Sequence, residues 1–225
     1  MRALFLFLIF VCVVSVDTIK SQNLSIGVTG NLGVSQINLL SDFPIPDYYE
    51  FDYSMSSSAG LFVQKTITKK SSLGIEILWV QIQGREAEVN KPILTSSGFE
   101  RGLATEETDR SIAYIGGPIY YHLKFKNLGI KGGVQSMIYL SQKVNRKSSG
   151  VLDGEPYSYE GEWDDIRYND FDYGLKMGLD YSLNDHLRLR ADYYHGFKSI
   201  IPYWIARSLK IRQFTLGIEY DIYHL

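Results

Sequence analysis

The 225-residue sequence has one cysteine, six prolines and no marked excess of charge of either sign. Its 23 basic and 25 acidic side chains give a formal net charge of -2, so there is no concentrated basic face for nucleic acid. A single cysteine excludes an internal disulfide framework. The abundant residues are 17 tyrosines and 20 glycines, which favour strands with aromatic edges over helices. We therefore expect no nucleic-acid partner.

The N-terminus carries the pattern of an export signal. Arg2 is followed by an apolar run over residues 3–14 and then by polar residues up to Gln22. About a dozen apolar residues fall short of the ~20 that a membrane-spanning helix needs. We predict a cleaved signal over residues 1–21 and a mature domain over residues 22–225, with cleavage after Val16 as the alternative. The only cysteine would be lost with the signal.

Strict alternation of apolar and polar residues, the pattern of a half-buried strand, recurs eight times. No segment keeps a convincing helical period. The connections between the runs alternate between short turns and long polar segments, which is typical of an up-and-down barrel in an outer membrane. The fold class predicted is therefore all-β, an eight-stranded antiparallel transmembrane β-barrel with short periplasmic turns and four long extracellular loops. The eight runs cover residues 24–35, 53–67, 73–83, 111–125, 128–141, 171–183, 187–197 and 209–223, and the long loops cover residues 36–52, 84–110, 142–169 and 198–208.

Two kinds of eight-stranded barrel fit this pattern, and they differ in which face is apolar. A soluble lipocalin-like barrel holds its apolar face inside around a ligand, whereas a membrane barrel turns it toward lipid. The apolar faces together carry about 40 large side chains, more than the interior of an eight-stranded barrel can hold. The sequence therefore favours a lipid-facing apolar surface, with the soluble ligand-binding barrel as the alternative. Outward aromatic residues are expected to form two belts, one at each end of the barrel.

The opposite, inward face collects charges of both signs. Charges in a narrow lumen are tolerated when they are paired, so we predict an ion-pair network that plugs the interior, with a selective pore as the alternative. The turn at residues 184–186 sets Asp180 opposite Arg190 as one specific pair of this network, and the turn at residues 126–127 places His122 opposite Lys131. Lys124, Asp172 and Asp221 share the inward parity. The predicted network consists of Glu76, Lys131, Lys176, Asp180, Arg188, Arg190, Asp192 and Glu219.

Catalytic and metal-binding patterns are weak. The four histidines lack the acidic or cysteine partners that a metal site requires, so no metal and no cofactor are expected. His195 and Ser199 are the residue types that some lipid-modifying outer-membrane enzymes use. Four strand residues separate them by ~13 Å, so the expectation is a protein that is not an enzyme, with a lipid-modifying enzyme as an alternative.

Two further segments indicate partners. The last strand fits the polar-x-Gly-x-x-apolar-x-apolar pattern that the barrel-assembly machinery reads in final strands, with Gly217, Tyr220 and Ile222 as its key residues. Loop residues 42–52 and 157–165 interleave acids with aromatics, which suits a surface ligand or a protein partner. The expected partners are thus outer-membrane lipid, the assembly machinery during biogenesis, and an unidentified surface ligand.

The middle of the chain resembles a known family. The stretch from Tyr114 through Pro118 to Phe125, followed by Gly132-Gly133 and by Tyr139-Leu140-Ser141, is similar to the core of the PorT-like outer-membrane β-barrel family common in Bacteroidota. That resemblance implies an eight-stranded barrel in a Gram-negative outer membrane. Because the family's namesake takes part in protein secretion, an accessory role in a secretion system is a further alternative. The function expected is structural or surface-binding, exerted through the extracellular loops around a plugged polar interior.

Overall fold

The computed structural model describes residues 24–40, 49–94, 100–162, 169–200 and 208–224. The predicted signal over residues 1–21 lies outside them, as do most of residues 42–52. Within the described ranges, no helix is long and apolar enough to cross a membrane. The strands are β1 (Leu24–Leu40), β2 (Tyr49–Asp52), β3 (Ser54–Thr68), β4 (Ser71–Leu94), β5 (Glu100–Phe125), β6 (Leu128–Leu152), β7 (Glu155–Glu162), β8 (Phe171–Ser182), β9 (Leu187–Gly196) and β10 (Ser208–His224).

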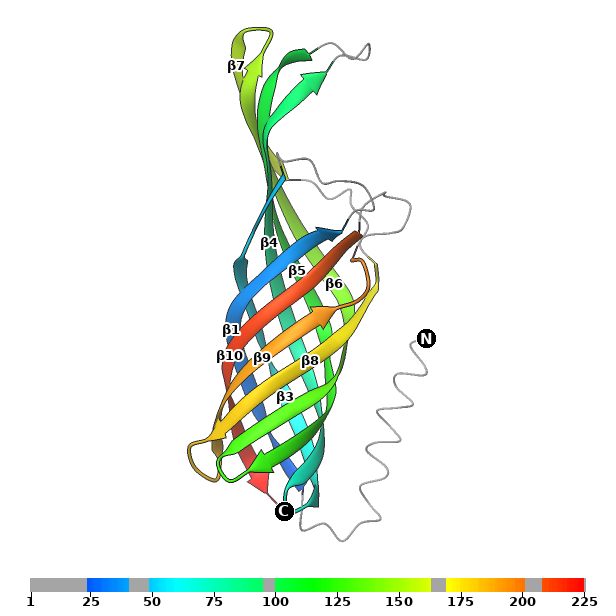
Figure 1. The fold of residues 1–225 in the computed structure, drawn as a ribbon, viewed down its shortest axis with the longest axis vertical. Helices are drawn as coiled ribbons and strands as arrows, with labels where there is room; N and C mark the ends of the chain where they lie inside the picture. The colour runs from blue at the N-terminus through cyan, green and yellow to red at the C-terminus, as the bar shows by residue number, and fades with distance from the viewer. Residues whose placement is uncertain (1–23, 41–48, 95–99, 163–168, 201–207, 225) are drawn as a thin grey trace.

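Eight of the strands close into a ring (Figure 1). Their order is β1, β3, β4, β5, β6, β8, β9 and β10, and β10 pairs back onto β1. Every neighbouring pair is antiparallel, as short hairpin turns between consecutive strands require. The all-β fold and the eight-stranded antiparallel barrel predicted from the alternation are confirmed.

Three strands continue well past the end of the barrel. β4 and β5 stay paired out to Leu94 opposite Glu100, and β6 pairs with β5 out to Leu152. A turn with positive φ at Asp153 and Gly154 then leads into β7, which pairs with β6. β2 pairs with β4 on the other side of this projection, which stands at the top of Figure 1. We call residues 85–94, 100–110 and 143–152, with β2 and β7, the extracellular sheet.

The prediction of loops at residues 84–110 and 142–169 was therefore wrong over most of their length. These segments lack apolar alternation because they have no lipid on one side, yet they form a ladder of backbone hydrogen bonds all the same. Cross-strand ion pairs replace apolar packing, so the segments look like loops in composition and are strands in structure.

The side chains follow the alternation, with apolar residues outside. Leu175 on β8 is 45% exposed, whereas its neighbour Lys176 is buried. Glu219 on β10 is 0% exposed between the exposed Ile218 and Tyr220. A surface on which most large apolar residues point outward is the arrangement of a membrane barrel. The alternative of a soluble lipocalin-like barrel with an apolar interior is wrong.

The outward aromatic residues lie where two belts were expected. Trp79, Phe171, Tyr173 and Phe214 are exposed on the half of the barrel nearer the extracellular sheet. The exposed residues nearer the short turns are Tyr121, Phe125, Tyr181 and Tyr220. Tyr173 contacts both Phe171 and Phe197 through its ring, so the upper belt is continuous from β8 to the residue that follows β9.

The interior is not polar throughout. In the half nearer the extracellular sheet, the inward side chains of β4 change from Glu76 to Leu78, Val80 and Ile82. Beyond Trp79 the outward side chains of the same strand become polar, as at Gln81. Alternation continues but its sense inverts, because water replaces lipid outside and the strands must bury apolar groups inside. The resulting apolar cap comprises Ile37, Leu78, Val80, Ile82, Ile112, Tyr114, Met137, Tyr194, Ile200, Leu209 and Ile211.

Candidate functional site

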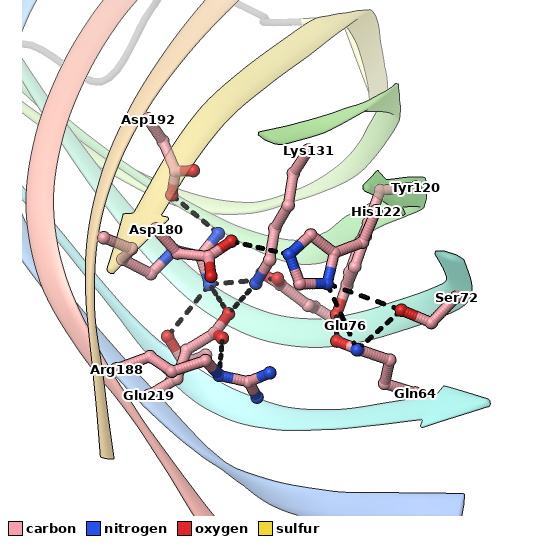
Figure 2. A network of polar contacts seen from close by, with 12 residues as sticks. Gln64, Ser72, Glu76, Tyr120, His122, Lys131, Asp180, Arg188, Asp192 and Glu219 are labelled. Atoms are coloured by element: carbon pink, nitrogen blue, oxygen red, sulfur yellow. Dashed lines mark hydrogen bonds and ion pairs between the residues drawn. The ribbon is translucent and has the colours of Figure 1, made fainter. Parts of the chain in front are cut away.

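The lower half of the barrel interior is filled by charged side chains centred on Glu219. Lys131 from β6 donates a hydrogen bond to its carboxylate. Arg190 Nη1 lies 2.6 Å from the same oxygen, and Arg188 Nε lies 3.1 Å from the other. One fully buried carboxylate is thus shared by three cations from two walls of the barrel (Figure 2). This sharing offsets the high cost of burying an isolated charge.

A second carboxylate centre connects the opposite wall. Arg190 Nη1 lies 2.9 Å from Glu76 on β4, and its Nη2 lies 2.6 Å from Asp192 on β9. Lys176 on β8 approaches Glu76 at 3.8 Å and Asp192 at 3.6 Å. Arg190 therefore links three carboxylates and crosses the lumen from β9 to β4. An arginine suits this position because its planar guanidinium carries five donors in a fixed fork.

A small cavity is lined by Lys176 and its two carboxylates. It has a volume of ≈ 10 Å³ and is lined in part by Pro118 and Tyr120. Glu76 and Asp192 line this space, and Glu76 Oε2 accepts no hydrogen bond from the residues that the structure describes. Space for one water molecule beside an unsatisfied carboxylate oxygen is the usual setting of a buried water. The gap is much too small for a solute to pass.

His122 forms a separate cluster nearer the short turns. Its Nε2 lies 3.0 Å from Asp180 Oδ2, and its Nδ1 lies 3.2 Å from Gln64 Nε2 and 3.4 Å from Ser72 Oγ (Figure 2). Gly129 leaves room for this pair, since an added Cβ there would lie 2.2 Å from His122 Nε2. The residue types are those of a Ser-His-Asp triad, but all three side chains are buried, and Gln64 already donates to Ser72 Oγ at 2.7 Å. The cluster is built for packing rather than for attack on a substrate.

The structure places all eight residues of the predicted network inside the barrel. Seven of them form one connected set of ion pairs, whereas Asp180 pairs with His122 instead. The predicted cross-strand positions are confirmed, because Asp180 lies opposite Arg190 and His122 opposite Lys131. The ion pair predicted between Asp180 and Arg190 was wrong. Among the described residues Asp180 pairs with His122, whereas the long Arg190 side chain reaches Glu76, Asp192 and Glu219. The sequence interpretation missed Gln64, Ser72 and Tyr120. The only feature of the sequence that indicates them is their inward position in the alternation of their strands.

Three further inward positions were assigned by parity. Asp221 pairs with Arg188 at 3.2 Å, and Asp172 accepts a hydrogen bond from Tyr194 at 2.9 Å. Lys124 is exposed at the rim beside the short turns, so its assignment to the interior was wrong. It sits one residue before the end of β5, where the barrel wall stops and water is available.

The C-terminal residues lie on β10, in contact with β1. Gly217 faces Asn31 across the pair, and an added Cβ would lie 2.0 Å from Asn31 Oδ1. Tyr220 and Ile222 face outward and are exposed. Their arrangement leaves an apolar outer face on the strand that closes the ring. Recognition of Gly217, Tyr220 and Ile222 by the assembly machinery stays a prediction.

His195 and Ser199 occupy different environments. The His195 ring packs against Tyr193 and Phe197 on the outer surface. Ser199 Oγ accepts a hydrogen bond from the Leu209 backbone N–H at 3.1 Å, beside the apolar cap. Within the described part of the chain, no group of three or more His, Cys, Asp or Glu residues could hold a metal ion. The expectation that the protein is not an enzyme stays a prediction.

The extracellular sheet is held together by ion pairs between neighbouring strands. Arg110 lies 2.6 Å from Glu86 on one face, and Arg85 lies 2.7 Å from Glu107 on the other. Partial burial opposes the charged form of Lys91, but the hydrogen bond and the charge of its neighbour Glu88 raise the pKa of Lys91 above its ordinary value. Further pairs join β5 to β6 (Arg146–Glu106), β5 to the turn after β6 (Arg101–Asp153) and β6 to β7 (Lys143–Glu162 and Lys147–Glu160).

Comparison with known proteins agrees with this architecture. A family model described as an outer membrane protein beta-barrel domain matches residues 20–202. The chain is similar in structure to the attachment invasion locus protein Ail of Yersinia pestis, at 10% identity over 88% of this chain and 98% of that chain, with a TM-score of 0.38. Neisserial surface protein A is also similar, at 10% identity over 88% and 99% of the two chains, with a TM-score of 0.40.

A third similar structure is OprG from Pseudomonas aeruginosa, at 10% identity over 92% of this chain and 100% of that chain, with a TM-score of 0.36. At such identities the likeness concerns the fold alone. No curated protein matches the sequence.

Proposed function

The chain belongs to the outer membrane protein beta-barrel domain family, and from that premise we propose that it binds another protein at the cell surface through its extracellular sheet. The plugged interior supports a binding role over a conducting one. The shared carboxylates fill the lower half of the lumen, and the apolar cap fills the upper half. Eight strands leave no open channel once such side chains occupy the inside.

A row of exposed apolar side chains near the tip of the sheet carries the proposal. Leu103 lies opposite both Pro92 and Val151, and Val151 lies opposite Pro156. The row thus crosses β4, β5, β6 and β7, and all four side chains are exposed. These residues lie far beyond the aromatic belt, so lipid does not cover them. Aligned apolar groups held in water on a rigid sheet are typical of a protein-binding surface.

The free edge of β7 supports a polypeptide partner. Among the described strands, β7 pairs only with β6, which leaves its other edge open to an added strand. A second copy of the chain is a poor partner here. Antiparallel pairing of two β7 edges would bring together Glu155, Glu160 and Glu162 from both copies. We therefore propose a different protein as the partner.

Site-specific photocrosslinking on intact cells tests the proposal. A photoreactive side chain at Leu103 is expected to capture a protein that the same group at Ser149 captures much less. The captured protein is then purified, and its affinity is measured for the wild type, for Leu103→Asp/Val151→Asp, and for the matched control Gln83→Asp/Ser149→Asp. We expect the first variant to lose at least about tenfold in affinity, which is ~1.4 kcal/mol, and the control to stay within about twofold.

Equal capture at Leu103 and Ser149 would contradict the proposal. So would a partner whose affinity is unchanged by two charges in the apolar row, because burying an unpaired carboxylate at an interface is costly.

Within the family, we propose that the chain falls among the PorT-like barrels of Bacteroidota. The stretch from Tyr114 to Phe125, which forms the membrane part of β5, supports this likeness, as does Tyr139-Leu140-Ser141 on β6. Membership among the PorT-like barrels would imply an accessory role in protein secretion. Deletion of the gene is then expected to reduce the secreted protein pool, and unchanged secretion would remove this role.

A further inference from the structure

Two cations of β10 face outward at the level of the upper aromatic belt. Ile211 and Gln213 are buried inside, so the intervening Arg212, and Lys210 by the same alternation, point away from the lumen. Both side chains are partly exposed. Phe214, the next outward residue along the strand, is exposed and belongs to the belt. Arg212 and Lys210 therefore lie where a lipid-facing surface meets water.

Aromatic rings lie near Arg212 on the neighbouring strand, and a further cation of the belt lies beside Phe171 on β8. Arg212 is the cross-strand partner of His195, whose ring packs against Phe197. Lys198 follows on the same chain segment, with its ammonium 5.9 Å from the centre of the Phe171 ring. Aromatic rings beside cations are the usual composition of a membrane interface, where rings lie among headgroups and cations meet their charges.

Within the part of the chain that the structure describes, no carboxylate neutralises the charges of Arg212 and Lys210. Neither forms an ion pair with any carboxylate in the described ranges. Arg212 Nη1 donates to the Gly196 carbonyl at 3.0 Å, which orients the guanidinium and leaves most of its donors available. By contrast Arg85, which also faces outward, lies 2.7 Å from Glu107.

We propose that Arg212 and Lys210 bind the phosphate of a phosphorylated glycolipid in the outer leaflet. A guanidinium and an ammonium converging on one oxyanion form short, charge-assisted hydrogen bonds. The position at the belt selects a lipid headgroup over a soluble anion, since the acyl chains of the same lipid would cover the apolar surface below Phe214. The site thus fixes one lipid against β9 and β10.

Thermal unfolding of the purified, folded protein in detergent micelles tests the site with three added ligands. These are a phosphorylated glycolipid, the same glycolipid after removal of its phosphates, and inorganic phosphate. We expect stabilisation by the phosphorylated glycolipid alone. Lys210→Gln/Arg212→Gln is expected to weaken its binding about 30-fold, since each cation near an anionic membrane surface contributes about fivefold. The matched control Lys69→Gln/Lys70→Gln removes two exposed cations from the short-turn end and should bind as the wild type does.

Equal binding of the phosphorylated glycolipid by the wild type and by Lys210→Gln/Arg212→Gln would overturn the proposal. Stabilisation by inorganic phosphate to the same extent would also overturn it, because it would identify a site for a free anion. The variant Arg212→Lys keeps the charge and is expected to retain most of the binding, which separates loss of charge from a folding defect.

Discussion

Replacement of Glu219 by Gln removes the negative charge on which the interior network converges. Glu219 is 0% exposed and contacts Lys131, Arg188 and Arg190. Arg190 keeps two other carboxylates and Arg188 keeps Asp221, but Lys131 loses its only ion pair among the described residues. Breaking a buried pair costs about 3 to 5 kcal/mol. Because Arg190 and Arg188 keep other carboxylate partners, we expect Glu219→Gln to destabilise the protein by about 3 kcal/mol, the lower end of this range.

Urea unfolding of the folded protein in detergent micelles measures this loss. With a slope of about 1 to 3 kcal/mol per molar urea, the midpoint should fall by about 1 to 3 M. Lys131→Met combined with Glu219→Gln should be more stable than Glu219→Gln alone, because it also removes the unpaired charge. Glu162→Gln is the control. Its partner is Lys143, both side chains are more than half exposed (71% and 62%), and the expected cost is below about 1 kcal/mol.

A cost of Glu219→Gln no larger than that of Glu162→Gln would refute the reasoning. It would mean that water enters the lumen and solvates Lys131, so that the carboxylates are not needed to hold the cations.

Three further substitutions test other parts of the account, each by the temperature at which the folded band of the protein disappears on a denaturing gel. Gly129→Ala places a methyl group within 2.6 Å of both His122 and Asp180, and should cost about 1 to 3 kcal/mol; an unchanged temperature would contradict the close packing. Ile112→Ala empties part of the apolar cap and should cost about 2 to 5 kcal/mol, unless the cap is loosely packed. Lys143→Gln should change stability by less than about 1 kcal/mol, and a larger loss would mean that the extracellular sheet depends on this single pair.

The alternation of apolar and polar residues predicted the barrel because lipid tolerates few polar side chains on the outer face of a strand. Every outward residue between the two belts must be apolar, so positions such as Leu175 and Ile218 mark the strand face unambiguously. The same parity placed Glu76 and Glu219 inside. Outside the membrane that demand ends. Apart from the apolar row at Leu103 and Val151, the strands of the extracellular sheet therefore carry mostly polar residues on both faces and resemble loops in composition.

The alternation along each strand could not predict which charged side chains form ion pairs inside the barrel. Register fixes which residues are neighbours across one hairpin, as for Asp180 and Arg190. Long side chains in a narrow lumen also reach the far wall, and Arg190 contacts Glu76 across it. The apolar cap was missed for a related reason: inward and outward faces exchange character where the strands leave the membrane, and a rule that assigns all apolar residues to lipid fails at Ile82.

The central claim is that the outer face of the barrel contacts lipid while the extracellular sheet stands in water. The most direct test compares Leu216→Arg with Leu103→Arg in lipid vesicles, since both leucines are exposed apolar residues (59% and 46%) on outward strand faces. Leu216 lies within the outward apolar run of β10, between Phe214 and Ile218, so its replacement should cost about 2 to 4 kcal/mol of folding free energy. Leu103→Arg should stay within about 0.5 kcal/mol of the wild type. Equal tolerance of arginine at both positions would contradict the account.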